Sequence, residues 1–222
     1  MRAKKRTGPP TSSPLNLDKK VRVRRLSNGM KAVVCENREV SQAYVVAMFK
    51  AGSRFENVKD NGLTHVLEHM VFRGAGSYRD SRALNEAAED IGGMLEAATY
   101  RDLVTFSTGA HRSEVRKAID IVGALVSAPK FQNIETEKAI ICEEVLESLD
   151  ARGRMIDIDN VSHRLIFGDH PLAKPIEGTL ENVKRFSIRD LRRYQEQIFN
   201  GGNGVVAVSV SRYSTELWEW LE

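Results

Sequence analysis

The feature that most constrains this chain is an apolar segment, residues 61–72, that also carries two histidines and a glutamate. His65 and His69 stand four residues apart, and Glu68 directly precedes the second histidine. Residues four apart lie on one face of a helix, so both imidazoles could reach a single metal ion. Glu68 would lie beside them, where it could hold a water molecule and accept its proton. The apolar positions would anchor this helix in a core, and Asp60 is predicted to cap it.

Two interpretations of this pattern compete. Histidine and glutamate also occur on helices without any chemical role, and a match of three fixed residues arises by chance in about one chain in a hundred. The apolar flanks favour a site, because burying three ionisable groups is costly unless something pairs with them. We therefore favour zinc over a structural polar cluster, since His-x-x-Glu-His is the inverted form of a zinc-peptidase motif.

The composition fits a globular protein and excludes several functions. The chain has 222 residues, of which 41% are hydrophobic and 28% charged, enough for one sizeable domain or two small ones. The net charge of +3 gives no reason to expect a nucleic acid, and no apolar run is long enough to span a membrane. Cys35 and Cys142 each lie in an apolar run, which indicates buried free thiols in a reducing compartment, with a single disulfide as the alternative.

The chain is expected to divide into a basic flexible tail, residues 1–18, and one domain, residues 19–222. The tail is rich in Lys, Arg, Pro, Ser and Thr and lacks the apolar stretch of a secretory signal. Its charges are not interleaved with aromatic residues, which argues against nucleic-acid binding. We expect a cytoplasmic location. An organelle matrix is the alternative, although no amphipathic helix supports a transit segment.

Hydrophobic periodicity and turn residues predict an α+β fold, with an antiparallel-rich β-sheet covered by helices. Strands are expected at 21–25, 30–36, 42–49, 94–99, 103–108 and 204–210, the third of them buried and central. Helices are expected at 81–91, 113–127, 133–150, 157–167 and 188–198, in addition to the metal-binding helix. Their predicted caps include Asp80, Asn133 and Ser187.

A catalytic zinc usually has three protein ligands, so the two histidines require one more. The helix predicted from residue 133 offers five glutamates: Glu135, Glu137, Glu143, Glu144 and Glu147. Glu137, Ile140 and Glu144 share one stripe of that helix, whereas the other three glutamates lie off it and are expected to be solvated. Periodicity leaves Glu137 and Glu144 as two open candidates.

Together these motifs resemble the pitrilysin-type zinc peptidases, in particular the bacterial members that are similar to the mitochondrial processing peptidase. Seventy-four residues separate His69 from Glu144, which is the spacing of the third zinc ligand in that family. The family's further glutamate, seven residues before this ligand, corresponds to Glu137. The segments 52–56, 169–172 and 178–179 also match family landmarks. The resemblance extends from about Val21 to Val210 and implies the N-terminal catalytic half.

The resemblance implies a zinc-dependent endopeptidase that holds one Zn²⁺ per chain through His65, His69 and Glu144. Glu68 would accept the proton of the zinc-bound water, and Glu137 would assist without binding the metal. A peptide substrate would be added as a strand to the edge strand, whose predicted contact residues are Leu95, Glu96, Ala97, Ala98 and Thr99. Most relatives have Asn at the position of Glu96, a departure that leaves the local substrate contact open.

Three further points follow from the resemblance. His111, His163 and His170 match no ligand position and are interpreted as turn, structural or solvated residues. The alternative function is a non-catalytic or regulatory subunit of a peptidase-like complex, because the family includes members without the motif. Relatives are usually built from two similar halves, so we expect a homodimer or a second chain that supplies the missing half. Residues 217–221 have the spacing of a final helix.

Overall fold

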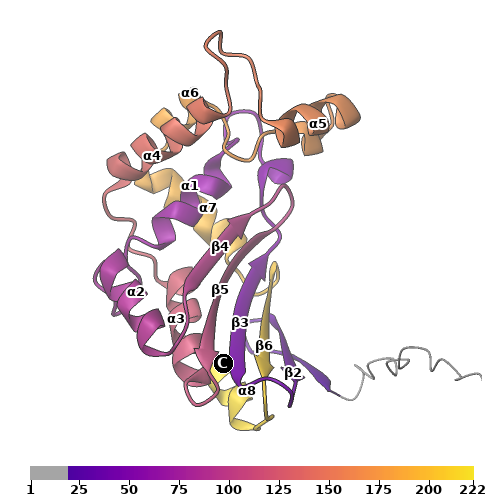
Figure 1. The fold of residues 1–222 in the computed structure, drawn as a ribbon, viewed down its shortest axis with the longest axis vertical. Helices are drawn as coiled ribbons and strands as arrows, with labels where there is room; N and C mark the ends of the chain where they lie inside the picture. The colour runs from indigo at the N-terminus through magenta and orange to yellow at the C-terminus, as the bar shows by residue number, and fades with distance from the viewer. Residues whose placement is uncertain (1–19) are drawn as a thin grey trace, which may run out of the picture.

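The structure is a computed structural model that describes residues 20–222, so the predicted tail lies outside the described residues. Figure 1 shows a twisted sheet with helices gathered along it. The strands are β1 (Val21–Arg25), β2 (Lys31–Glu36), β3 (Gln42–Phe49), β4 (Leu95–Thr99), β5 (Val104–His111) and β6 (Gly204–Val210). They form one six-stranded sheet in the order β1-β2-β6-β3-β5-β4.

The predicted α+β class and both predicted hairpins are confirmed. β1 pairs antiparallel with β2, and β4 pairs antiparallel with β5. β6 inserts between β2 and β3, parallel to β2 and antiparallel to β3. The last strand of the chain therefore completes the centre of the sheet, and β4 is left at one edge.

Within residues 20–222, eight α-helices and two 3₁₀ turns accompany this sheet. The helices are α1 (Leu63–Val71), α2 (Ser81–Asp90), α3 (Val115–Ser127), α4 (Ile134–Glu147), α5 (Ile158–Phe167), α6 (Leu180–Arg185), α7 (Ile188–Ile198) and α8 (Glu216–Leu221). The 3₁₀ turns are η2 (Ser53–Phe55) and η3 (Pro171–Ala173). In Figure 1, α1, α2 and α3 lie on the same side of the sheet, while α5 projects away from it. α8 confirms the predicted final helix and buries Leu217 and Trp218.

One face of the sheet forms the core. Along β3 the buried residues alternate as Ala43, Val45, Ala47 and Phe49, whereas Tyr44 is 41% exposed. Side chains on a strand point alternately to its two faces, so only the helix-covered face is sealed. The prediction that β3 is central is confirmed, but only its alternate residues are buried.

The predicted cap Asp60 is wrong, and the predicted cap Asn133 has the right position but makes no capping bond. The first residue before α1 is Gly62, in a left-handed conformation with φ 98°, and no side chain of its own caps the helix. Asn133 also adopts a left-handed conformation, with φ 58°, and its side chain makes no capping bond to α4. The caps Asp80 and Ser187 are confirmed by bonds to Ala83 N and Asp190 N.

Gly62 is required because two distant loops touch at this point. A Cβ atom on Gly62 would lie 2.7 Å from the carbonyl oxygen of Glu177, and one on Gly178 would lie 2.4 Å from that of Asn61. Both glycines have positive φ, which other residues adopt only at a cost. The start of α1 is therefore locked against the loop that precedes α6.

Two global expectations can be compared with the described residues. Between residues 20 and 222, no helix is both long and apolar enough to cross a membrane. Cys35 and Cys142 are both free and half-buried, so the predicted disulfide alternative is not found.

Candidate metal site

Helix α1 carries the histidine and glutamate motif on a well-anchored backbone. Its buried residues are Leu63, Thr64, Val66, Leu67, Met70 and Val71. The two histidines face the other way, and their side chains remain 14% and 21% exposed. Because the apolar side of the helix is fixed in the core, the histidine side is presented at the surface in one orientation.

The predicted ligands come together between α1 and α4. His65 Nε2 and His69 Nε2 each lie 3.7 Å from the same Glu144 oxygen, Oε2. The three potential ligand atoms all lie within 4.8 Å of one another. Two imidazoles and one carboxylate are a donor set that zinc prefers. These residues therefore fit a zinc ion, and their role as ligands stays a prediction.

Glu137 holds the second histidine from behind. This carboxylate is 3% exposed, and its Oε2 lies 3.2 Å from His69 Nδ1. Its other oxygen pairs with the guanidinium of Arg73. A charged carboxylate at Nδ1 favours the tautomer that donates from Nδ1 and keeps the Nε2 lone pair free for a metal. Glu137 was predicted as a site residue from the sequence, whereas Arg73, which follows α1, was not.

His65 differs from His69 in its pKa and in its hydrogen bonding. Burial, together with the neighbouring His69, lowers the pKa of His65 to about 4. The imidazole is therefore neutral at ordinary pH, as a metal ligand must be. Among the described residues, no atom makes a hydrogen bond to His65 Nδ1, although that atom is buried.

Glu68 is a half-buried carboxylate that touches the edge strand. Burial raises its pKa, and a hydrogen bond donated by the Thr99 hydroxyl acts in the opposite direction. A raised pKa brings a carboxylate closer to the range in which it can both accept and return a proton. Thr99 is the last residue of β4, so the candidate base lies directly at the end of the candidate substrate strand. The sequence placed Thr99 in that strand but gave no sign of this bond.

Strand β4 has the predicted edge position, since it pairs only with β5 among the described strands. The carboxylate of Glu96 accepts a hydrogen bond of 3.0 Å from the hydroxyl of Tyr44, a residue of β3 in the same sheet. The substrate role of residues 95–99 is not tested by this geometry and stays a prediction.

Glu56 was not among the predicted site residues; its carboxylate is 4% exposed and bonds to the start of α1. A glutamate in a loop carries no periodic signal. Its only visible sign was its place in the segment 52–56, which matches a family landmark.

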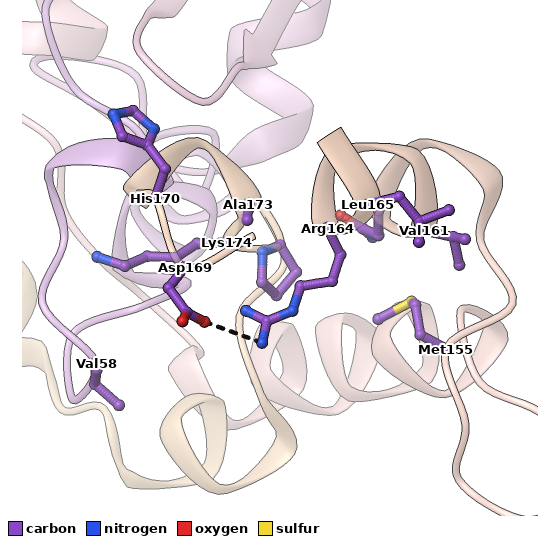
Figure 2. A pocket seen from close by; sticks show the side chains of 11 residues that line it. Val58, Met155, Val161, Arg164, Leu165, Asp169, His170, Ala173 and Lys174 are labelled. Carbon is purple, nitrogen blue, oxygen red and sulfur yellow. Dashed lines mark ion pairs between the residues drawn. The ribbon is translucent and has the colours of Figure 1, made fainter. Parts of the chain in front are cut away.

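Three cavities can be compared with the site, and the smallest of them, of about 310 Å³, is lined in part by Glu68, His69 and Glu137. A second cavity, of about 620 Å³, borders His65 and is strongly acidic, with Glu144, Glu147, Asp157 and Glu177 in its lining. Burial raises the pKa of Glu144, His69 opposes this, and Glu177 and Glu147 add to the rise. Figure 2 shows a third cavity, of about 530 Å³, beside α5 and η3. None of the candidate ligands lines it.

The remaining histidines lie outside the three-residue group. His111 ends β5 and bonds to the Ser113 hydroxyl at 2.9 Å, close to the predicted turn position. His163 lies on α5, and His170 caps η3 by accepting a bond from Leu172 N. Their positions give no reason to change the interpretation as structural residues.

Comparison with known proteins tests the resemblance that the motifs indicate. Residues 32–180 match the family described as Insulinase (Peptidase family M16). The chain belongs to peptidase family M16. A probable mitochondrial-processing peptidase subunit beta of Arabidopsis thaliana is 34% identical over 190 residues, which are 85% of this chain and 35% of the relative. Human cytochrome b-c1 complex subunit 1 is 31% identical over 83% of this M16 chain and 38% of the relative.

Solved structures support the same fold. A protease from Helicobacter pylori superposes with a TM-score of 0.81 at 18% identity, covering 91% of this chain and 49% of that one. An inactive M16 domain from Pseudomonas fluorescens gives a TM-score of 0.79 at 18% identity, over 90% of this chain and 49% of that one. The M16 chain spans little more than a third of the curated relatives and about half of these structures. Since active and inactive members superpose equally well, the fold alone does not establish catalysis.

Proposed function

We propose that this M16 chain is a zinc-dependent endopeptidase unit. The observation that carries the proposal is the convergence of His65 Nε2, His69 Nε2 and Glu144 Oε2, with a half-buried Glu68 beside them. Chains that have lost catalysis have no need to keep a free carboxylate next to such a donor set. The full set therefore favours an enzyme.

The mechanism follows from the roles that these side chains can take. The two histidines and Glu144 would hold a zinc ion, which when bound polarises a carbonyl and lowers the pKa of water towards about 7. Glu68 would accept the proton of the attacking water on its carboxylate and pass it to the leaving amine. Thr99 would orient that carboxylate through its hydroxyl. Glu137 and Arg73 would keep the His69 ring in its metal-binding tautomer.

The substrate would be an extended peptide or an unfolded protein segment. An exposed sheet edge offers unpaired main-chain groups, and a peptide that pairs with them gains affinity with little sequence preference. The β4 edge, Leu95–Thr99, ends at the residue that contacts Glu68. A peptide aligned along this edge would thus be led to the candidate base.

The test combines metal analysis with a peptidase assay on the purified chain. We expect about one zinc per chain and cleavage of unfolded peptides that stops on chelation and returns with zinc. A folded chain that binds no zinc would contradict the proposal.

A second candidate function is a non-catalytic or regulatory subunit. It is favoured by the similarity to a cytochrome b-c1 complex subunit and to an inactive M16 domain. Zinc binding without cleavage would support a regulatory metal-binding subunit, and neither property would support a scaffold.

We also propose that residues 19–222 form one domain that works in an assembly, either a homodimer or a complex with a second chain. Support comes from the names of its relatives, which describe subunits. Light scattering and activity at increasing dilution test this idea, and a monomer with dilution-independent activity would contradict it.

Both relatives are named as mitochondrial, which favours the organelle matrix over the cytoplasm as the location of this chain.

A further inference from the structure

The two histidines of the candidate site are supported unequally. His69 is held through its own ring, because Glu137 Oε2 lies 3.2 Å from its Nδ1 atom. His65 has no such partner among residues 20–222, since no described atom bonds to its buried Nδ1. The direction of the His65 ring must therefore be set by its backbone and its packing.

That backbone is fixed by a buried carboxylate outside the helix. Glu56 Oε1 accepts hydrogen bonds of 2.7 Å from both the backbone N–H and the hydroxyl of Thr64. Its Oε2 accepts bonds of 2.8 Å from Gly62 N and 3.2 Å from Asn61 Nδ2. Four donors fill the acceptor sites of one carboxylate, and two of them are the N–H groups that a helix start leaves unpaired. Glu56 thus supplies the cap that Gly62 cannot provide.

The network continues from the helix into α7. The Thr64 hydroxyl donates to Glu56, so its oxygen can only accept from the two other groups within reach. These are Gly52 N at 3.1 Å and the Tyr194 hydroxyl at 2.7 Å. The chain of bonds therefore runs from Tyr194 through Thr64 to Glu56, and it clamps the residue that directly precedes His65.

We propose that Glu56 is a positioning residue of the metal site, which fixes the first turn of α1 and through it the direction of the His65 imidazole. The inference rests on the proposed function, in that it treats His65 Nε2 as a metal ligand. Glu137 would then orient His69 by a direct contact, and Glu56 would orient His65 through the helix backbone. Residues that orient metal ligands typically contribute about 10–100-fold to metal affinity.

The experiment measures zinc affinity by competition with a chelator, and the histidine ring signals of the zinc-free protein by ¹H–¹⁵N NMR. We expect Glu56→Gln to weaken zinc binding about tenfold or more, because an amide turns an NH₂ group toward donors. In the Glu56→Gln variant the ring signals of His65 should shift, while those of His69 should stay in place. Thr64→Val, which keeps the side-chain shape, should give a smaller change in the same direction, and Tyr194→Phe the smallest.

Val34→Ala is the matched control, because Val34 is fully buried in β2, away from the site. It should lower the free energy of unfolding but leave zinc affinity and both sets of ring signals unchanged. The proposal is overturned if Glu56→Gln binds zinc like the unaltered chain with unshifted His65 signals. Thr64→Val carries the same test if Glu56→Gln does not fold. If the unaltered chain binds no zinc, the proposed function fails, but the ring signals still decide the role of Glu56.

Discussion

Helices α1 and α4 contribute to the same site but are built in opposite ways. Six of the nine residues of α1 are buried, whereas only Glu137, Ile141 and Val145 are buried among the 14 residues of α4. The histidines are consequently held on a fixed frame. Glu144, with its side chain 37% exposed, approaches that frame from a helix that faces solvent along most of its length. The difference suggests that α1 sets the geometry and α4 completes it.

The strongest expected effect comes from the fixed helix. Glu68→Gln should keep the metal but lower turnover by about 10²–10⁴-fold, the usual contribution of a general base. Zinc content and peptidase rate should be measured on the same sample. Normal turnover in a folded Glu68→Gln protein would remove Glu68 from this role.

The next largest effect distinguishes two neighbours on α4. Glu144→Gln should weaken zinc binding by more than the roughly 10–100-fold that supporting residues contribute, because it removes a ligand. Glu143→Gln is the matched control, since Glu143 is exposed and lies outside the three-residue group. Competition with a chelator gives both affinities. Equal losses in the two variants would mean that the wrong carboxylate has been assigned.

Glu137→Gln should have an intermediate effect, because Glu137 contacts the ring of His69 but is not itself a candidate ligand. We expect zinc affinity to fall about 10–100-fold, less than for Glu144→Gln, together with slower turnover. The same chelator assay decides the order. A larger loss for Glu137→Gln than for Glu144→Gln would reverse the roles of the two glutamates.

The smallest effect is expected at the edge strand. The Thr99 hydroxyl lowers the pKa of Glu68 by bonding to its charged form, so Thr99→Val should raise that pKa further. Because the base must be ionised, the acidic limb of the pH–rate profile should move to higher pH. Above this limb, turnover should change by less than about tenfold. An unmoved limb would show that the hydroxyl does not act on the base.

Much of the fold could be predicted because it is encoded locally. The alternating residues of β3, the hairpin turns and the caps at Asp80 and Ser187 are short-range signals, and the structure agrees with them. The parallel pairing of β2 with β6 has no local signal, because it joins segments far apart in the chain. α6 was missed because a six-residue helix is too short to show periodicity.

For the site, the residues on periodic elements were found and those in loops were not. Spacing placed His65, Glu68 and His69 on one helix, and the structure brings Glu144 to them. Asp60 was predicted as the cap because its residue type is common there, but the contact between Gly62 and Gly178 sets a different backbone. The capping oxygen comes from Glu56 instead.

The contact between Gly62 and Gly178 also bears on the order in which this chain can fold. It joins two loops more than a hundred residues apart, and closing so long a loop is slow and late compared with forming a single helix. All three candidate ligands precede Gly178 in the chain. A fragment that stops before this residue would contain every ligand and still lack the contact that locks the start of α1. Zinc uptake should therefore report the completion of folding rather than its beginning.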